Sequence, residues 1–105
     1  MEEYVSRFKA LGDPLRLKIL NLLPLEQRCE DVYNVSELSQ ELGVSQPTVS
    51  HHLKILKAAG LVICARTCRD VYYWIDRQVL EDCARALGDG SFCRAPRKRK
   101  KGTKP

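Results

Sequence analysis

The stretch SELSQELGVSQPTVSHHLKILKAAGL, residues 36–61, decides the fold. Ser36 can cap a first helix, and Gly43 stands where the end of a helix favours a left-handed residue. Ser45 can then cap a second helix that has a proline in its first turn, and Gly60 closes that helix. Two short capped helices joined by a tight turn that contains glycine predict a helix-turn-helix.

The second predicted helix has two chemically different faces. At 100° per residue, one face is apolar and carries Val49, Leu53 and Leu56. The opposite face is polar, and no acidic residue occurs between Ser45 and Ala59. Such a face can enter a major groove and contact base edges, although an ordinary solvated helix is polar too. The candidate DNA-contacting residues on this helix are Gln46, Pro47, Thr48, Ser50, His51 and Lys54.

The chain resembles the ArsR/SmtB repressors in three segments: FKALGDPLRLKILNLL (8–23), SQPTVSHHLKILKAAGLV (45–62) and VYYWID (71–76). The resemblance implies a homodimeric winged helix-turn-helix, mainly α-helical with a small β-hairpin. It implies binding to an inverted-repeat operator in double-stranded DNA, from which an inducer releases the protein. It also implies base or phosphate contacts by Gln46, Ser50 and His51, whereas His52 is expected to pack against the domain.

Length and composition set further bounds. With 105 residues, of which 44% are hydrophobic, we expect one domain with a small core that dimerisation would extend. No apolar run approaches the roughly 18 residues of a membrane span, and the N-terminus is unlike a signal peptide. We therefore expect a cytoplasmic protein that has no membrane partner.

The net charge of +5 is concentrated at the C-terminal end of the chain. Residues 94–105 contain seven basic residues and no acid, whereas the remainder has 11 basic and 13 acidic residues. We expect a DNA-binding and dimerisation domain over residues 1–93 and a disordered basic tail over 94–105. The tail can add non-specific DNA affinity by releasing counterions, so that its deletion would lower the salt dependence of binding. The alternative is a plain solubilising end.

Three further helices are expected besides the two of the helix-turn-helix. One covers residues 1–10, and the next is a core helix that Asp13 caps. The last covers residues 77–87, with Asp76 as its cap and Gly88 as its end. Its apolar stripe has no partner within the predicted fold, and the resemblance assigns this helix to the dimer interface.

A β-hairpin is predicted between the second helix of the helix-turn-helix and the last helix. LVICAR (61–66) and DVYYWI (70–75) are rich in β-branched and aromatic residues. Beside a helix-turn-helix such a hairpin is a wing, and Arg66 and Arg69 near its tip could contact phosphates or a minor groove. The alternative is a solvated turn. The aromatic residues 72–74 could stack on bases, but strand spacing favours a role in the core and in wing support.

Enzyme signatures are missing from the sequence. It has no Gly-rich phosphate loop and no HExxH motif. Ser50 is followed by His51 and His52, but these side chains diverge around a helix and lack the third member of a triad. The rival to a repressor is therefore a winged-helix interaction module that binds protein instead of DNA.

The inducer sites of the ArsR/SmtB family are poorly matched. The family's cysteine cluster falls on Asn34, Ser36 and Ser39, so that site is absent. Only Asp76 matches a ligand of the family's Asp–His site on the last helix. Nothing outside the cysteines is therefore expected to bind a metal ion.

Cysteine is the remaining candidate for a sensor. Cys83 and Cys93 are the best-placed pair, because the segment after the last helix can fold Cys93 back over that helix. Four residues of extended strand separate Cys64 from Cys68 by about 13 Å, so these two form a poor chelate. A third ligand could be Cys29, Cys64 or a cysteine of the partner subunit.

Thiolates select soft ions, so the expected inducers are As(III), Sb(III) or Cd(II), and no cofactor is required for DNA binding. Two alternatives stay open. The cysteines could form a thiol-redox or persulfide switch, or they could be small buried hydrophobes that sense nothing.

Overall fold

The structure is a computed structural model that describes residues 1–25, 33–67 and 70–89. Its elements are, in order, α1 (Glu2–Leu11), α2 (Pro14–Leu22), α3 (Val35–Leu42), α4 (Gln46–Ala58), β1 (Val62–Thr67), β2 (Asp70–Ile75) and α5 (Arg77–Asp89). The predicted fold class, mainly α-helical with one small β-hairpin, is confirmed. Some predictions fall outside the described residues, namely those for Cys29, Cys68, Arg69, Cys93 and the basic tail 94–105.

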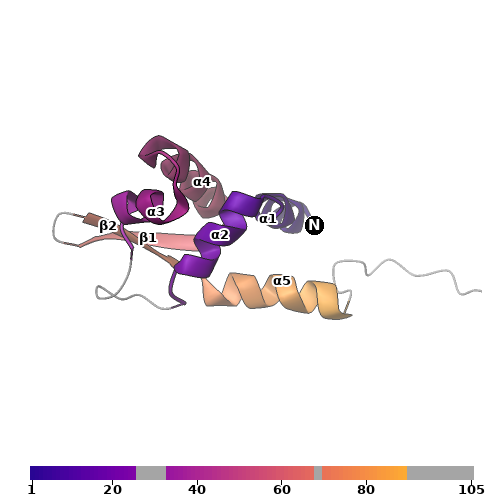
Figure 1. The fold of residues 1–105 in the computed structure, drawn as a ribbon. Coiled ribbons are helices and arrows are strands. Elements are labelled where there is room, and N and C mark those ends of the chain that lie inside the picture. The colour runs from indigo at the N-terminus through magenta and orange to yellow at the C-terminus, as the bar shows by residue number, and fades with distance from the viewer. Residues whose placement is uncertain (26–32, 68–69, 90–105) are drawn as a thin grey trace, which may run out of the picture.

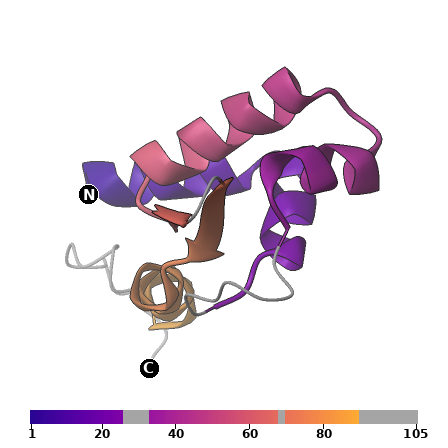
Figure 2. The same cartoon turned by 90° about the vertical axis from the view of Figure 1, so that its left-hand side faces the viewer.

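Figures 1 and 2 show how these elements are arranged. In both views α4 lies on one side of the molecule and α5 on the opposite side, with α1 and α2 between them. The β1–β2 hairpin extends away from the N-terminus of α1 (Figure 1). Within the described segments, no helix has the length and apolar character that a membrane span requires.

Asp13 caps α2, as predicted. Its Oδ2 accepts hydrogen bonds from the amides of Leu15 and Arg16 at 2.9 and 3.1 Å, and Pro14 begins the helix. The bond from the Arg16 amide is the main interaction that lowers the pKa of the Asp13 carboxyl. The capping group is therefore an ionised acceptor at neutral pH.

The helix before the turn begins earlier than predicted. Asn34 caps α3 by accepting a hydrogen bond from the Glu37 amide at 2.8 Å, and Glu37 Oε1 accepts one from the Asn34 amide at 3.0 Å. The prediction that Ser36 is the cap is wrong, because this reciprocal capping box places the serine inside the first turn.

The turn between α3 and α4 forms as predicted. Gly43 ends α3 with φ +70°, a left-handed conformation that favours glycine. Ser45 caps α4 by accepting a hydrogen bond from the Thr48 amide at 3.3 Å. Gly60, with φ +81°, follows the end of α4 and turns the chain into β1.

The core lies between the helix-turn-helix, α2 and the base of the hairpin. Its fully buried side chains include Ile19, Leu38, Leu53, Leu56, Leu61 and Val49. The prediction of α2 as a core helix holds for Ile19 and Leu20, but Leu17 on the same helix is 50% exposed. The apolar face of α4 is thus used for packing, which fixes the direction of its other face.

The hairpin is a two-stranded antiparallel sheet with Val62 opposite Ile75 at its base and Thr67 opposite Asp70 at its tip. Val62 and Ile75 are buried in the core, and the Ile75 amide donates a hydrogen bond to the Pro24 carbonyl at 2.8 Å. The base of the wing is therefore anchored to the body of the domain, while its tip projects.

The last helix is longer than predicted. Asp76 Oδ1 accepts a hydrogen bond from the Val79 amide at 3.4 Å, so the predicted cap is present. The prediction that Gly88 ends the helix is wrong, because α5 continues to Asp89 and Gly88 keeps a helical backbone. Glycine permits a left-handed turn but does not impose one.

Replacement of Gly43 and of Gly88 by alanine should change the free energy of unfolding in opposite directions. Gly43→Ala should lower the free energy of unfolding by about 1 kcal/mol, because an L-residue is strained at φ +70° even though a Cβ there has open space. Gly88→Ala should raise it by about 0.5 kcal/mol, because alanine favours the helix and its Cβ meets no atom of the described residues. Denaturant unfolding at one protein concentration measures both. A Gly43→Ala variant as stable as the wild type would contradict the assigned turn.

Candidate nucleic-acid interface

The outward side of α4 carries the side chains that the sequence predicts for DNA contact. Its exposed members are Gln46, Pro47, Ser50, His51 and Lys54, which we call the reading face. The opposite side packs completely, since Val49, Leu53 and Leu56 are each 0% exposed. The division of α4 into a polar and an apolar face is therefore as predicted, and packing of the apolar face leaves the polar face towards solvent.

Thr48 differs from its neighbours on the first turn of α4. It is half-buried, and its Oγ1 lies 2.8 Å from Ser45 Oγ in a hydrogen bond. The Thr48 amide also donates to Ser45 Oγ, so both groups of this residue serve the cap. Thr48 therefore stabilises the first turn of α4 and is not an exposed member of the reading face.

The reading face carries a positive charge and no negative charge. No carboxylate stands between Ser45 and Ala59, and the ion pairs between described side chains both lie on α5. Lys54 is thus exposed without a described carboxylate to neutralise it. An unneutralised cation among hydroxyl, amide and imidazole groups suits a partner with phosphates and base edges.

His52 lies beside the reading face but is not part of it. Its ring is half-buried, and the ring centroid lies 5.3 Å from that of His51 in an edge-to-face arrangement. His52 Nδ1 is 3.1 Å from a guanidinium nitrogen of Arg16 on α2. The expectation that His52 packs against the domain is therefore met.

The wing places Arg66 near its tip with an exposed side chain. Arg66 pairs with Val71 across the hairpin, one step from the last described pair. Tyr72, Tyr73 and Trp74 are half-buried, and burial is the main cause that raises the pKa of Tyr73. Tyr73 packs against the core, as the strand spacing predicts, whereas the roles of Tyr72 and Trp74 stay predictions. Arg66 is the described basic residue nearest to the tip of the wing.

The described cysteines are not assembled into a metal site. Among the described residues, no group of three or more Cys, His, Asp or Glu side chains could hold an ion. Cys83 is 2% exposed, and its burial is the main cause that raises the pKa of its thiol, with Arg7 acting in the opposite direction. Cys64 is half-buried on β1, opposite Tyr73. The predicted partner of Cys83, Cys93, lies outside the described residues.

Sequence reasoning missed the role of Arg16. Its guanidinium donates to the Ala10 carbonyl at 2.7 Å and to the Lys9 carbonyl at 3.5 Å, as well as contacting His52. The sequence carries no signal for this role, since Lys18 stands in the same leucine-rich segment and is exposed.

The helix-turn-helix, the anchored hairpin beside it and the polar face of α4 define the class of winged helix-turn-helix proteins. The family model described as "bacterial regulatory protein, arsR family" matches residues 13–63. The chain belongs to the ArsR family, whose members are transcriptional regulators and not enzymes.

Relatives along most of the chain support this assignment. An HTH-type transcriptional regulator of Methanocaldococcus jannaschii is 43% identical over 86 residues, which cover 77% of this chain and 91% of that protein. The transcriptional repressor SdpR of Bacillus subtilis is 37% identical over 75 residues, covering 71% and 78%. The arsenical resistance operon repressor of Staphylococcus aureus is 31% identical over 86 residues, covering 82% and 78%.

Solved structures share the fold. An ArsR-like transcriptional regulator from Rhodococcus sp. RHA1 matches with a TM-score of 0.71 and 31% identity, covering 86% of this chain and 80% of that one. A homodimeric winged helix-turn-helix DNA-binding domain from Mycobacterium bovis matches with a TM-score of 0.66 and 26% identity, covering 95% and 89%.

Proposed function

We propose that this protein is a homodimeric transcriptional repressor that binds an inverted-repeat operator through α4. The observation that carries the proposal is the acid-free reading face, which a fully buried opposite face holds towards solvent. In this role Gln46, Ser50 and His51 contact base edges or phosphates. Its site of action would be chromosomal DNA in the cytoplasm.

The cations have a different task in this proposal. Lys54 on α4 and Arg66 on the wing neutralise phosphates on either side of the groove, with Arg69 as a further candidate at the wing tip. Phosphate contacts fix the register of the protein on the duplex but do not select a sequence. Affinity should therefore fall with salt, while the choice of operator depends on the other residues of the reading face.

The proposed dimer interface lies on α1 and α5, which contact each other within the subunit. Apolar side chains remain exposed on these helices, with Val5 at 49% and Leu87 at 64% exposure. The relative from Mycobacterium bovis is described as homodimeric, which supports the same state for this chain. A two-fold dimer presents two α4 helices, and half-sites one duplex turn apart, about 34 Å, would accept both.

The test is selection of duplexes from a pool of random sequence, followed by footprinting of the protein on the selected duplex. The proposal expects an inverted repeat with half-site centres about one helical turn apart and protection on one side of the duplex. Binding with no preference for sequence, or no binding to duplex DNA, would instead favour the interaction module.

For the inducer we propose a thiophilic ion, As(III), Sb(III) or Cd(II), bound by Cys83 together with Cys93. Cys29, Cys64 or a cysteine of the partner subunit is the candidate third ligand. The similarity to an arsenical resistance operon repressor supports this chemistry. Burial raises the pKa of the Cys83 thiol and Arg7 on α1 only partly opposes this, so the ion has to displace the thiol proton when it binds. An ion on Cys83 would act at the contact between α1 and α5, and could change the spacing of the two α4 helices.

Cysteine variants test the inducer separately from DNA binding. Under full reduction, As(III) or Cd(II) should release the wild type from the selected duplex, and Cys83→Ser or Cys93→Ser should raise the required concentration at least about tenfold, since each removes a thiolate ligand. Fluorescence anisotropy of the labelled duplex measures release. Cys64→Ser tests the candidate third ligand in the same assay: release like that of the wild type excludes Cys64, and a higher required concentration assigns it to the site. Equal release from all variants would exclude this pair as the sensor.

A further inference from the structure

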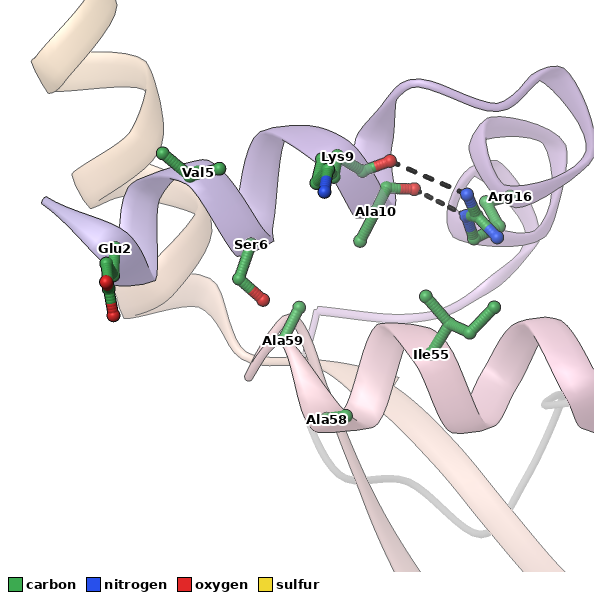
Figure 3. A pocket seen from close by; sticks show the side chains of 9 residues that line it. All are labelled: Glu2, Val5, Ser6, Lys9, Ala10, Arg16, Ile55, Ala58 and Ala59. Atoms are coloured by element: carbon green, nitrogen blue, oxygen red, sulfur yellow. Dashed lines mark hydrogen bonds between the residues drawn. The ribbon is translucent and has the colours of Figure 1, made fainter.

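One side chain links three of the helices on the α4 side of the domain. Arg16 projects from α2, and its Nε and Nη2 donate to the Ala10 and Lys9 carbonyls at the end of α1, at 2.7 and 3.5 Å (Figure 3). Its Nη1 lies 3.1 Å from Nδ1 of His52 on α4. The last carbonyls of a helix have no partner within that helix, so Arg16 caps α1 while it contacts α4.

The link lies at the end of an open groove between α1 and α4. The groove has a volume of about 580 Å³, and Figure 3 shows Arg16 at one end of it, with the N-terminal part of α1 at the other. Val5 and Ala59 line the groove away from Arg16. α1 and α4 also pack against each other, and through Arg16 the His52 side chain of α4 is tied to the end of α1 as well. The Arg16–His52 contact is thus placed to adjust the orientation of α4 relative to α1.

The contact requires one protonation state of His52. An arginine side chain has five N–H donors and no acceptor, so Nδ1 of His52 must be the acceptor. The imidazole is then neutral and carries its proton on Nε2. A second proton would fall on Nδ1, which would place two donors and two positive charges face to face. A protonated His52 must therefore leave Arg16.

The other charged groups around His52 do not remove this requirement. Asp13 at the start of α2 interacts favourably with a positive His52, but its Oδ2 already accepts from the Leu15 and Arg16 amides. His51 on α4 touches the edge of the His52 ring and would repel it when both are charged. The direct contact with Arg16 at 3.1 Å is thus the interaction that protonation reverses.

We propose that the Arg16–His52 contact positions α4 for operator binding and that it works only while His52 is neutral, so acidification weakens binding through His52. Arg16 and His52 are positioning residues in this scheme and do not touch DNA. The inference rests on the proposed function, because it concerns the geometry of a helix that reads a duplex.

An isosteric pair of variants tests the positioning role at about pH 7.5. His52→Asn keeps an acceptor, because Asn Oδ1 occupies the place of Nδ1 and cannot become a cation. His52→Leu has nearly the shape of asparagine but no acceptor. We expect the Asn variant to bind the selected duplex within about threefold of the wild type, and the Leu variant to bind roughly tenfold more weakly.

A pH profile provides a readout that a merely structural role would not change. The chain has two histidines, and histidine is the side chain whose charge ordinarily changes between pH 5 and 8. Protonation of His51 on the reading face should strengthen binding, which is opposite in sign. The quantity to measure is therefore the ratio of wild-type to His52→Asn affinity, in which His51 is common to both. We expect this ratio to fall as the pH is lowered, by up to about tenfold, which is the share of the affinity that the Leu variant lacks.

The outcomes are separable. Equal affinities of the Asn and Leu variants, or a ratio that stays constant with pH, would overturn the inference while the proposed function stands. If the wild type itself fails to select any duplex, the proposed function fails and the inference falls with it. The pH ratio does not use the Leu variant, so the inference can be refuted even if that variant does not fold.

Discussion

Lys54→Glu should lower the affinity for the selected duplex by at least about 100-fold and leave the fold and the dimer intact. Lys54 is exposed on the reading face, so its replacement removes no packing. The change removes a phosphate contact and sets a carboxylate against the duplex, and it does so twice in each dimer. A loss of about 1.4 kcal/mol in each of the two half-sites is enough for this effect, because every 1.4 kcal/mol is a factor of ten.

The control for Lys54→Glu is the same change in charge elsewhere. Lys18→Glu on α2 alters an exposed lysine outside the helix-turn-helix and should reduce affinity only weakly. Fluorescence anisotropy at several salt concentrations measures both variants, and the milder Lys54→Gln should lower the slope of log affinity against log salt by about one unit per subunit. Equal losses from Lys54→Glu and Lys18→Glu would show that net charge, and not the reading face, determines binding.

The parts of the fold that the sequence predicted correctly depend on residues close together in the chain. Ser45 and Asp13 cap helices through amides two or three residues away, and Gly43 needs only its own backbone angle. The two faces of α4 follow from its period of 3.6 residues. Such features can be predicted because their causes are local.

The two wrong predictions concern the start of α3 and the end of α5. Their causes are local too, but in each case the sequence offers two acceptable positions for the helix end. Ser36 and Asn34 both have side chains that can cap α3, and Glu37 decides for Asn34 because it completes the reciprocal pair. Gly88 was predicted as an end, yet it remains in α5 since nothing in its surroundings requires a turn. Residue preferences for helix ends rank the two positions, but they do not exclude the less favoured one.

The features that the sequence could not predict depend on packing between distant segments. Arg16 and His52 are 36 residues apart, and their contact exists because α2 and α4 pack against one another. Likewise, Cys83 on α5 is buried, and the positive charge near it comes from Arg7 on α1. The sequence left burial of Cys83 open as an alternative and did not indicate which helix lies beside it.

The second large effect is expected from charges on the proposed dimer interface. The double substitution Val5→Glu/Leu87→Glu should raise the dimer dissociation constant at least about 100-fold, because it places acidic groups where two apolar patches are proposed to meet. Operator binding should then be lost at protein concentrations that saturate the wild type. In a dimer the second reading face binds at an effective concentration near millimolar, and a free monomer lacks this advantage. Analytical ultracentrifugation and anisotropy on the same samples measure both effects.

Leu17→Glu is the matched control for this substitution. Leu17 is 50% exposed, close to the 49% of Val5, but it lies on α2 and not on the helices of the proposed interface. It should leave both the dimer and the affinity for the duplex nearly unchanged. A dimer that dissociates in Leu17→Glu and persists in the double variant would move the interface to α2. It would also remove the reason for expecting an ion on Cys83 of α5 to change the spacing of the two α4 helices, since α5 would no longer connect the subunits.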